Sequence, residues 1–282
     1  DLAGVGLTTG ENMSELSLEE KEEWAFKTYG KALLEVADEM PDRKFTLIHR
    51  QHFADPEYIA RKFKPLSDKE NIEFIYSFKY AKAHVFSTTK QPYHEEFVKN
   101  IGDLKTIWTL RNDDAYCFRW GAPDFVREFI SNIPYEVSRG YYYGSDQWIW
   151  GREFTTRNVA SNNRELEVVK HWYNWMLWGR LGYNPLISNE RFTGMLQSRF
   201  PGIDARKLFT AWQEASMIYP VTTAFHWGRV DFMWYIEGCR SHAHRSARNE
   251  TGFHDVDLFI NYPVHPKSGY QTIPDYVEMK LN

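Results

Sequence analysis

Short apolar runs alternate with amphipathic segments through the first half of the chain, and this alternation limits the possible folds more than any other feature. The runs begin 27 to 41 residues apart, about the length of one strand and one helix with their turns. Such repeats predict a parallel sheet with helices outside it, either a doubly wound open sheet or a (β/α)8 barrel. We expect the strands at Gly4–Thr9, Phe45–His49, Ile72–Phe78, Lys105–Leu110 and Ser138–Tyr143.

The segments between these runs carry helix signals. Ser17 and Glu20 form a capping-box pattern at the start of a helix expected at Leu18–Glu39. The buried stripe predicted for this helix contains Trp24, Leu33, Val36, Ala37 and Met40. Further helices are expected after the Asp55-Pro56 pair, near Tyr93–Asn100 and at Pro123–Asn132.

Charged residues follow the predicted strands, and this favours the barrel. In a barrel the carboxyl-terminal strand ends converge on one mouth, where active sites lie, whereas an open sheet would spread them along an edge. Five strands do not close a barrel. We therefore expect an incomplete (β/α)8 TIM-type barrel, its last five strands, at residues 1–154. The chain opens directly on a strand, which agrees with a fragment or trimmed terminus.

Residues 155–282 are expected to form a helical domain with an irregular tail. Helices are predicted at Leu166–Trp178, where Gly179 would end the helix, from Ser188 through Leu196, from Asp204 through Met217, and at Val230–His242. The tail from Gly252 to Asn282 is rich in turn-forming and polar residues.

Composition excludes several classes of protein. With 34 basic and 38 acidic residues, the net charge of −4 argues against a general nucleic-acid binder. No apolar run approaches the 18 residues of a membrane-spanning helix. The two cysteines, Cys117 and Cys239, form neither a disulfide framework nor a thiolate metal site. The 19 Phe, 17 Tyr and 11 Trp either fill a core or line a sugar-binding cleft.

Four carboxylates are candidates for acid–base chemistry. Glu11 directly follows the first strand, where aromatic walls could raise its pKa and let it act as a general acid. Asp113 and Asp114 are adjacent behind the fourth strand, and one of them could activate a water molecule. Asp146 follows the fifth strand. The structural alternatives are a salt-bridge role for Glu11, a turn cap for Asp113 and a solvated Asp114.

Cationic and aromatic residues near the same strand ends are candidates for substrate binding. The cations suggest a substrate that carries a carboxylate or sulfate, because arginine binds such groups with two parallel hydrogen bonds. Aromatic rings could stack on sugar faces, although a buried aromatic corner is the alternative. The residues are His49, Arg50, Lys79, Lys82, Arg111, Tyr142, Gln147, Trp148, Trp150, His226 and Arg229. No metal-binding or cofactor motif is present, so no metal or cofactor is expected.

Three segments resemble the α-glucuronidase-type glycoside hydrolases of families 67 and 115. They are the Gly10-Glu-Asn-Met13 segment, the Arg111-Asn-Asp-Asp114 run and, most specifically, Gly179-Arg-Leu-Gly-Tyr-Asn-Pro185 after an aromatic helix. The resemblance implies a barrel followed by a helical domain and the inverting removal of a uronic acid. It implies that Glu11 is the general acid, that Asp113 or Asp114 is the base, and that Asp146 is a second carboxylate. The stretch from Tyr141 to Trp150 departs from the family pattern.

The sequence therefore predicts a glycoside hydrolase acting on an acidic poly- or oligosaccharide. Two alternatives stay open: a glycan-binding protein without catalysis, and a barrel lyase or isomerase with Lys79 or Lys82 as its base. The partner expected is a carbohydrate substrate, not nucleic acid or a membrane. A glycan-degrading role favours a periplasmic or secreted location. The sequence leaves the oligomeric state open.

Overall fold

The computed structural model describes residues 2–9, 13–50, 54–78, 89–90, 94–111, 119–144, 169, 171–225, 271 and 273–282. The chain divides into two compact units. The first unit contains Asp1–Lys79, Pro92–Thr109 and Pro134–Tyr142. The second contains Tyr80–Gln91, Leu110–Ile133 and Tyr143–Asn282, so that the helix at Pro123–Ser131 belongs to it. Each unit is described by itself.

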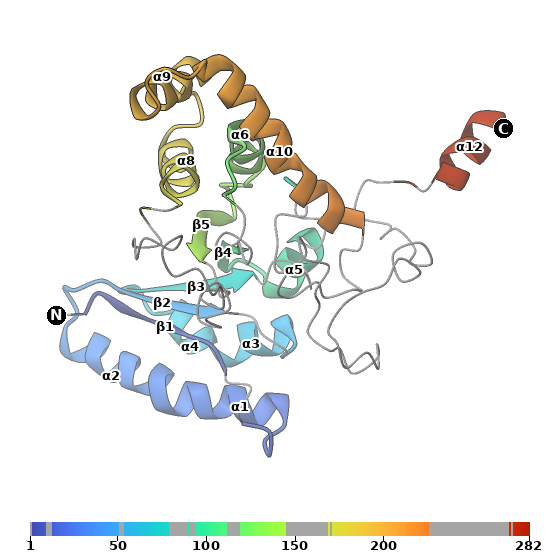
Figure 1. The fold of residues 1–282 in the computed structure, drawn as a ribbon. Helices are drawn as coiled ribbons and strands as arrows, with labels where there is room; N and C mark the ends of the chain where they lie inside the picture. Colours follow the sequence, from blue (N-terminus) through green and yellow to red (C-terminus); the bar gives the residue numbers. More distant parts are fainter. Residues whose placement is uncertain are drawn as a thin grey trace. The chain divides into compact units, whose positions relative to one another are not determined.

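The first unit is built on a five-stranded sheet in the order β1-β2-β3-β4-β5 (Figure 1). The three pairings from β1 to β4 are parallel, and β5 joins β4 through the Thr106 amide, which donates to the Val137 carbonyl at 2.8 Å. The strands are β1 (Gly4–Leu7), β2 (Phe45–Arg50), β3 (Ile72–Phe78), β4 (Lys105–Arg111) and β5 (Ser138–Gly144). All five agree with the predicted strands to within two residues, and the parallel α/β class is confirmed. The closed eight-stranded barrel stays a prediction.

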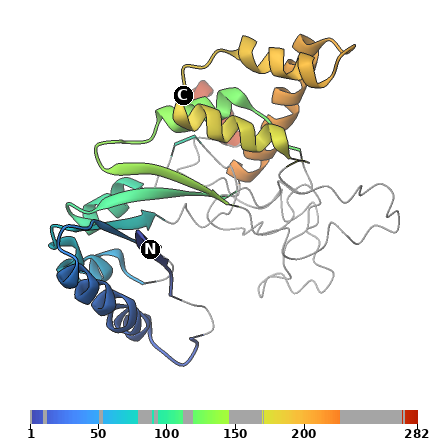
Figure 2. The same cartoon turned by 90° about the vertical axis from the view of Figure 1, so that its left-hand side faces the viewer.

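Helices cover one face of this sheet. Figures 1 and 2 show α1 (Leu18–Ala25), α2 (Lys31–Glu39), α3 (Pro56–Lys62) and α4 (Lys64–Ser67) on the same side of β1–β3. Strand side chains alternate between faces, so every second residue of β2 and β3 packs beneath the helices. Phe63, between α3 and α4, stacks on Phe74 of β3 at 5.5 Å between ring centroids. The fifth helix, α5 (His94–Ile101), brings Phe97 to within 5.0 Å of the Tyr76 ring.

The helix predicted at Leu18–Glu39 contains a π-helical turn, η1 (Phe26–Gly30), between α1 and α2. A π turn inserts one extra residue and so rotates the buried face of the helix. Leu33 and Ala37 are buried as predicted, but Trp24, Val36 and Met40 are 45%, 37% and 45% exposed. Towards the start of the helix, the buried residues are instead Gly30, Ala25 and Glu22. The amphipathic pattern failed here because it assumed an uninterrupted α-helical period.

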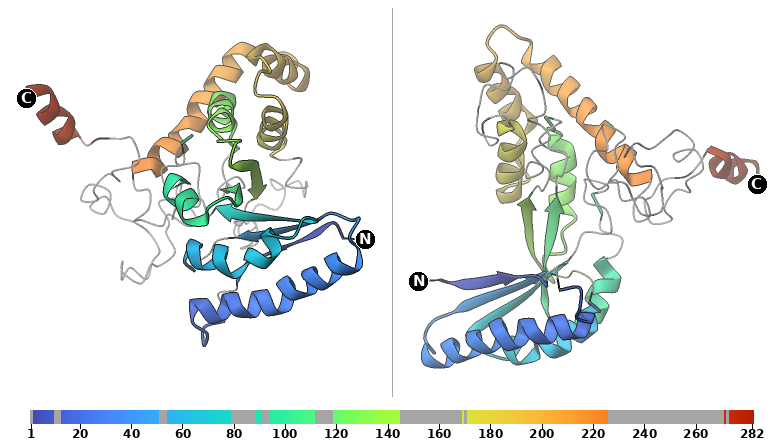
Figure 3. Two further views of the ribbon diagram at one scale, coloured as in Figure 1. Left: turned by 180° about the vertical axis from the view of Figure 1, so that it is seen from behind. Right: turned by 60° about the horizontal axis from the view of Figure 1, so that its bottom comes forward.

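The described residues of the second unit are mostly helical, and Figure 3 shows its helices from two further sides. Its buried aromatic rings include Trp120 and Trp178, stacked with centroids 6.0 Å apart, and Phe129, which meets Trp178 edge-on at 5.4 Å. The ring of Tyr173 packs on that of Trp212, with a distance of 4.6 Å between the ring centroids. The helices are α6 (Pro123–Ser131), α8 (Trp172–Tyr183), α9 (Asn189–Arg199), α10 (Ala205–Phe225) and α12 (Ile273–Leu281).

Three predictions for this region need correction. Gly179 does not end α8, which continues to Tyr183, because a single glycine weakens a packed helix without breaking it. Asp204 caps α10 as predicted, accepting from the Arg206 and Lys207 amides at 3.1 Å, but the helix extends to Phe225. The tail is not irregular throughout, because α12 lies within it. The helix predicted at Val230–His242 lies outside the described residues.

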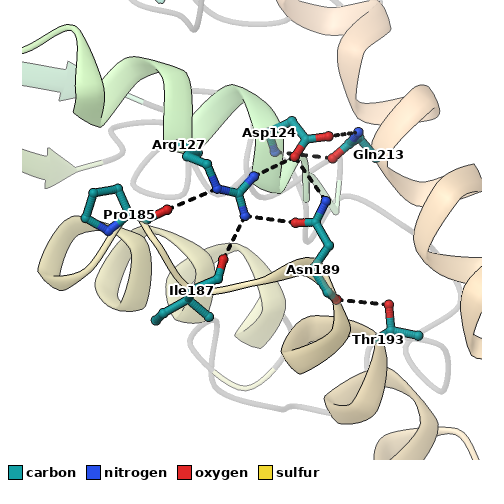
Figure 4. Close-up of polar contacts among 7 residues, drawn as sticks. All are labelled: Asp124, Arg127, Pro185, Ile187, Asn189, Thr193 and Gln213. Atoms are coloured by element: carbon teal, nitrogen blue, oxygen red, sulfur yellow. Dashed lines mark hydrogen bonds and ion pairs between the residues drawn. The ribbon is translucent and has the colours of Figure 1, made fainter.

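The turn after α8 is held by the side chain of Arg127 on α6 (Figure 4). Its guanidinium donates to the carbonyls of Pro185 and Ile187 at 3.0 and 2.9 Å and to Asn189 Oδ1 at 2.8 Å. It also pairs with Asp124 at 2.6 Å, and Asp124 in turn accepts from Gln213 of α10 at 2.6 Å. These hydrogen bonds hold the pKa of Asp124 below its ordinary value against the effect of burial. In this structure the Pro185 carbonyl of the family-like segment is therefore one of the acceptors of Arg127.

Candidate functional site

The carboxyl-terminal ends of the first four strands lie at one edge of the sheet. Parallel pairing aligns Leu7 with His49, Arg50 with Ser77, and Phe78 with Trp108. Several predicted site residues follow these ends along the sequence. Glu11 comes four residues after β1, Lys79 directly after β3, and Asp113 two residues after β4. Ligands of parallel α/β folds bind at this edge, so it is the candidate site.

Most residues of the predicted site are not part of the described structure, so their roles stay predictions. The side chain of Arg111 belongs with them, although its backbone ends β4. The residues outside the described part are Glu11, Lys79, Lys82, Asp113, Asp114, Asp146, Gln147, Trp148, Trp150, His226 and Arg229.

Arg50 is the predicted binding residue that the structure describes best. It is the last residue of β2, and strand alternation turns it to the face opposite the helices. Its Nε atom is buried, and no hydrogen-bond acceptor lies within reach among the described residues. A buried guanidinium N–H without an acceptor is costly, and an anionic ligand would remove that cost.

Ser77 and Tyr142 lie on the same face of the sheet as Arg50. Ser77 of β3 is paired with Arg50 in the sheet and has no solvent exposure. Its hydroxyl lies 3.5 Å from the phenol oxygen of Tyr142 on β5, and the Tyr142 residue is 36% exposed. Among the predicted site residues, the structure therefore brings Arg50 and Tyr142 to the same face of the sheet, with Ser77 next to both. A cation, hydroxyl groups and an accessible aromatic ring can together bind an acidic sugar.

His49 occupies a different place from its neighbour Arg50. The sequence prediction grouped both as substrate-binding residues, but the structure places them on opposite faces of β2, because adjacent strand residues alternate. The His49 side chain has no solvent exposure. Its Nε2 lies 2.5 Å from Glu22 Oε2 on α1, and its Nδ1 lies 3.1 Å from the Arg50 carbonyl oxygen. His49 therefore lies on the helix side of β2, where its buried side chain contacts Glu22 and the Arg50 carbonyl.

Sequence reasoning did not identify Glu22 or Thr9. Glu22 is fully buried and also accepts a hydrogen bond of 3.1 Å from the Thr9 hydroxyl, just after β1. The sequence does contain one signal for such a residue. His49 lies at a buried position of a predicted strand, and a buried imidazole needs a polar partner nearby. Among the described residues, no group of three or more histidine, cysteine, aspartate or glutamate side chains could hold a metal ion. Within the same residues no helix combines the length and apolarity needed to span a bilayer.

Two tyrosines of the sheet have phenols that stay protonated. Burial raises the pKa of Tyr141 on β5 to about 12. Burial also raises the pKa of Tyr76 on β3, and the Glu22 carboxylate adds to this effect. At neutral pH both phenols therefore keep their protons, and neither is a base.

The fold resembles one known from a solved structure. No protein-family model matches the chain, and no curated protein matches it. The solved structure of a protein described as a GH138 enzyme targeting pectin rhamnogalacturonan II matches with a TM-score of 0.58 and 19% identity. The match covers 79% of this chain and 33% of that one, so this chain spans about a third of the length of the GH138 enzyme. At this identity the likeness is one of fold.

Proposed function

We propose that this chain is part of a glycoside hydrolase that acts on acidic glycans, with uronic-acid or sulfated residues. The proposal depends above all on Arg50, a cation at the carboxyl-terminal edge of a parallel sheet whose buried Nε has no acceptor among the described residues. The fold likeness to a GH138 enzyme supports a glycan-degrading role. In this proposal the five strands form part of a (β/α)8 barrel, followed by a helical domain at residues 155–282.

The proposed chemistry uses two carboxyl groups. Glu11 protonates the glycosidic oxygen as it leaves, and Asp113 or Asp114 removes a proton from the water that attacks the anomeric carbon. Inversion needs the two carboxyl groups about 6.5–9.5 Å apart, which leaves room for that water. Asp146 would be a further carboxylate of the site.

The proposed binding groups recognise the acid function and the sugar rings. Arg50, Lys79, Lys82 and Arg111 would neutralise the carboxylate or sulfate. Tyr142 and Gln147 would contact ring and hydroxyl groups, and the same role is proposed for Trp148, Trp150, His226 and Arg229.

Arg50→Met tests substrate recognition. Binding of a uronic-acid oligosaccharide is measured by calorimetry and compared with its methyl ester, which has the same shape but no charge. We expect Arg50→Met to weaken binding of the acid by about 10–100-fold, the value of a charged hydrogen bond, and binding of the ester much less. Arg191→Met, which replaces an exposed residue of α9, is the control. Equal losses for acid and ester would rule out recognition of the charge by Arg50.

Glu11→Gln tests the chemistry. The variant should lose about 100- to 10,000-fold in kcat on a substrate with a poor leaving group, since it removes the proton donor. Binding of the same substrate should be unchanged. Wild-type turnover by Glu11→Gln would refute the assignment of the acid. A wild-type chain that binds acidic glycans but never cleaves them would support the glycan-binding alternative.

A further inference from the structure

The buried group formed by Thr9, Glu22 and His49 is an unusual feature of the sheet unit. Their side chains meet between the sheet and α1, and the exposed fractions of the three residues are 5%, 0% and 0%. Glu22 accepts from Thr9 through Oε1 and contacts His49 through Oε2. One carboxyl group therefore links the segment after β1 to the end of β2. We call these three residues the strand clamp.

The protons of the strand clamp follow from its hydrogen bonds. The Arg50 carbonyl is an acceptor only, so His49 Nδ1 carries a proton and donates to it. His49 Nε2 and Glu22 Oε2 are 2.5 Å apart, within hydrogen-bond distance, so each of these buried side chains has the other as its partner.

The surroundings of the clamp hold its geometry. The His49 ring packs edge-on against Phe63 at 4.8 Å and against Tyr76 at 5.7 Å between centroids. Both aromatic side chains are fully buried. The imidazole therefore cannot turn away from Glu22 without disturbing a packed aromatic layer.

We infer that Glu22 is a positioning residue for the glycan site, an inference that rests on the proposed function. Through His49 it fixes the backbone carbonyl of Arg50, and so the point from which the guanidinium extends on the other face. Through Thr9 it fixes the end of β1, two residues before Glu11 in the sequence. A site works only when its binding groups are held by a second layer of contacts, because a displacement of about 1 Å can cost about a hundredfold in rate.

Three variants of the full chain separate geometry from charge. Glu22→Gln keeps the shape: its amide can donate to His49 Nε2 while its carbonyl accepts from Thr9. Glu22→Ala removes both links, and Thr9→Val removes the link to β1 alone. The matched control is Glu19→Ala, which replaces an exposed glutamate on the same helix. Two measurements are made, hydrogen exchange of the backbone amides and binding of the acidic oligosaccharide.

The exchange measurement reports on the clamp itself. Glu22→Ala should raise exchange in residues 4–9 and 45–50 at least about tenfold while 72–78 changes less, because local opening follows lost contacts. Thr9→Val should affect 4–9 alone, and Glu22→Gln should resemble the wild type. Unchanged exchange in Glu22→Ala would overturn the clamp.

The binding measurement reports on positioning. Glu22→Ala should weaken binding about tenfold, and Glu22→Gln should restore it to within about threefold of wild type. In an Arg50→Met background, Glu22→Ala should have little further effect, since groups that act through one another are not additive. Additive losses would overturn the positioning role. If the wild type bound no acidic glycan but Glu22→Ala still loosened both strands, the proposed function would fail and the clamp would stand.

Discussion

Arg127 on α6 reaches Asn189 at the start of α9 through a hydrogen bond of 2.8 Å, and the same guanidinium binds two backbone carbonyls of the turn between α8 and α9. A planar group with five N–H donors suits this arrangement, because its acceptors lie in several directions. The aromatic helix α8 and the turn after it are therefore held by a side chain from a segment some sixty residues earlier.

Replacing Arg127 should measure the strength of this connection. Arg127→Lys keeps the charge but cannot reach the two carbonyls and Asn189 at once, so we expect the free energy of unfolding to fall by about 1–2 kcal/mol. Arg127→Ala should cost more, because Asp124 also loses its ion pair. Urea unfolding checks both values, with Arg191→Lys on the exposed side of α9 as the control. If Arg127→Lys had the same free energy of unfolding as the wild type, the several N–H donors of the guanidinium would be unimportant for stability.

Gly121 should not tolerate a side chain. A Cβ atom at this position would lie 2.4 Å from a ring carbon of Tyr173, which is itself buried. We expect Gly121→Ala to lower the free energy of unfolding by about 1–3 kcal/mol through overpacking. Gly194→Ala on α9 meets open space and should raise it by about 0.5–1 kcal/mol. Thermal unfolding of the two variants checks that their unfolding temperatures shift in opposite directions. Equal shifts of the two temperatures would contradict the packing argument.

Much of the sheet could be predicted because its signals are local. Runs such as Ile72–Phe78 are short, apolar and bounded by polar turns, and the structure has a strand with the same bounds. The Asp55-Pro56 helix start was equally clear, and Asp55 indeed caps α3 by accepting from the Tyr58 amide at 3.0 Å. Such features depend on neighbouring residues, so the sequence is sufficient to find them.

Other features depend on partners far along the chain. Glu22 lies in an acidic stretch that reads as an exposed helix face, and only His49, 27 residues later, makes its burial favourable. Which of His49 and Arg50 faces the helices depends on the register of β2. A shift of one residue would move each side chain to the other face of the sheet. The π turn at Phe26–Gly30 has no pattern of its own and displaced the predicted stripe.

Asn71 should be sensitive to loss of its amide. Its Nδ2 donates to the Ala37 carbonyl at 2.9 Å and lies 3.2 Å from those of Met40 and Arg43, joining the end of α2 to the start of β3. Asn71→Asp would place a carboxylate against three carbonyl oxygens, so we expect a loss of about 2 kcal/mol or more. Asn71→Ala removes the donor without adding charge and should cost less. Urea unfolding gives the order, and an Asn71→Asp variant as stable as Asn71→Ala would contradict it.

His94 should make the protein less stable in mild acid. Burial lowers its pKa to about 4, against the opposing attraction of Glu136, whereas an unfolded histidine titrates near 6.5. As the pH falls from about 6.5 to about 4, the unfolded chain takes up a proton that the folded chain does not, so stability is lost across this window. His94→Gln stays neutral, and its amide can replace Nε2 beside the Thr106 hydroxyl, 3.2 Å away.

The test for His94 is a comparison of two stabilities at two pH values. The free energy of unfolding in urea is measured for the wild type and for His94→Gln at pH 7 and pH 5. Subtracting the two pH-dependent changes cancels the contributions of all other titrating groups. The wild type should lose about 1–2 kcal/mol more than the variant between these values, because only its unfolded state gains the proton at position 94. An equal loss in both proteins would mean that His94 titrates in the folded chain as it does in the unfolded one, and that its contacts with Phe97 and Trp108 do not exclude the charged form.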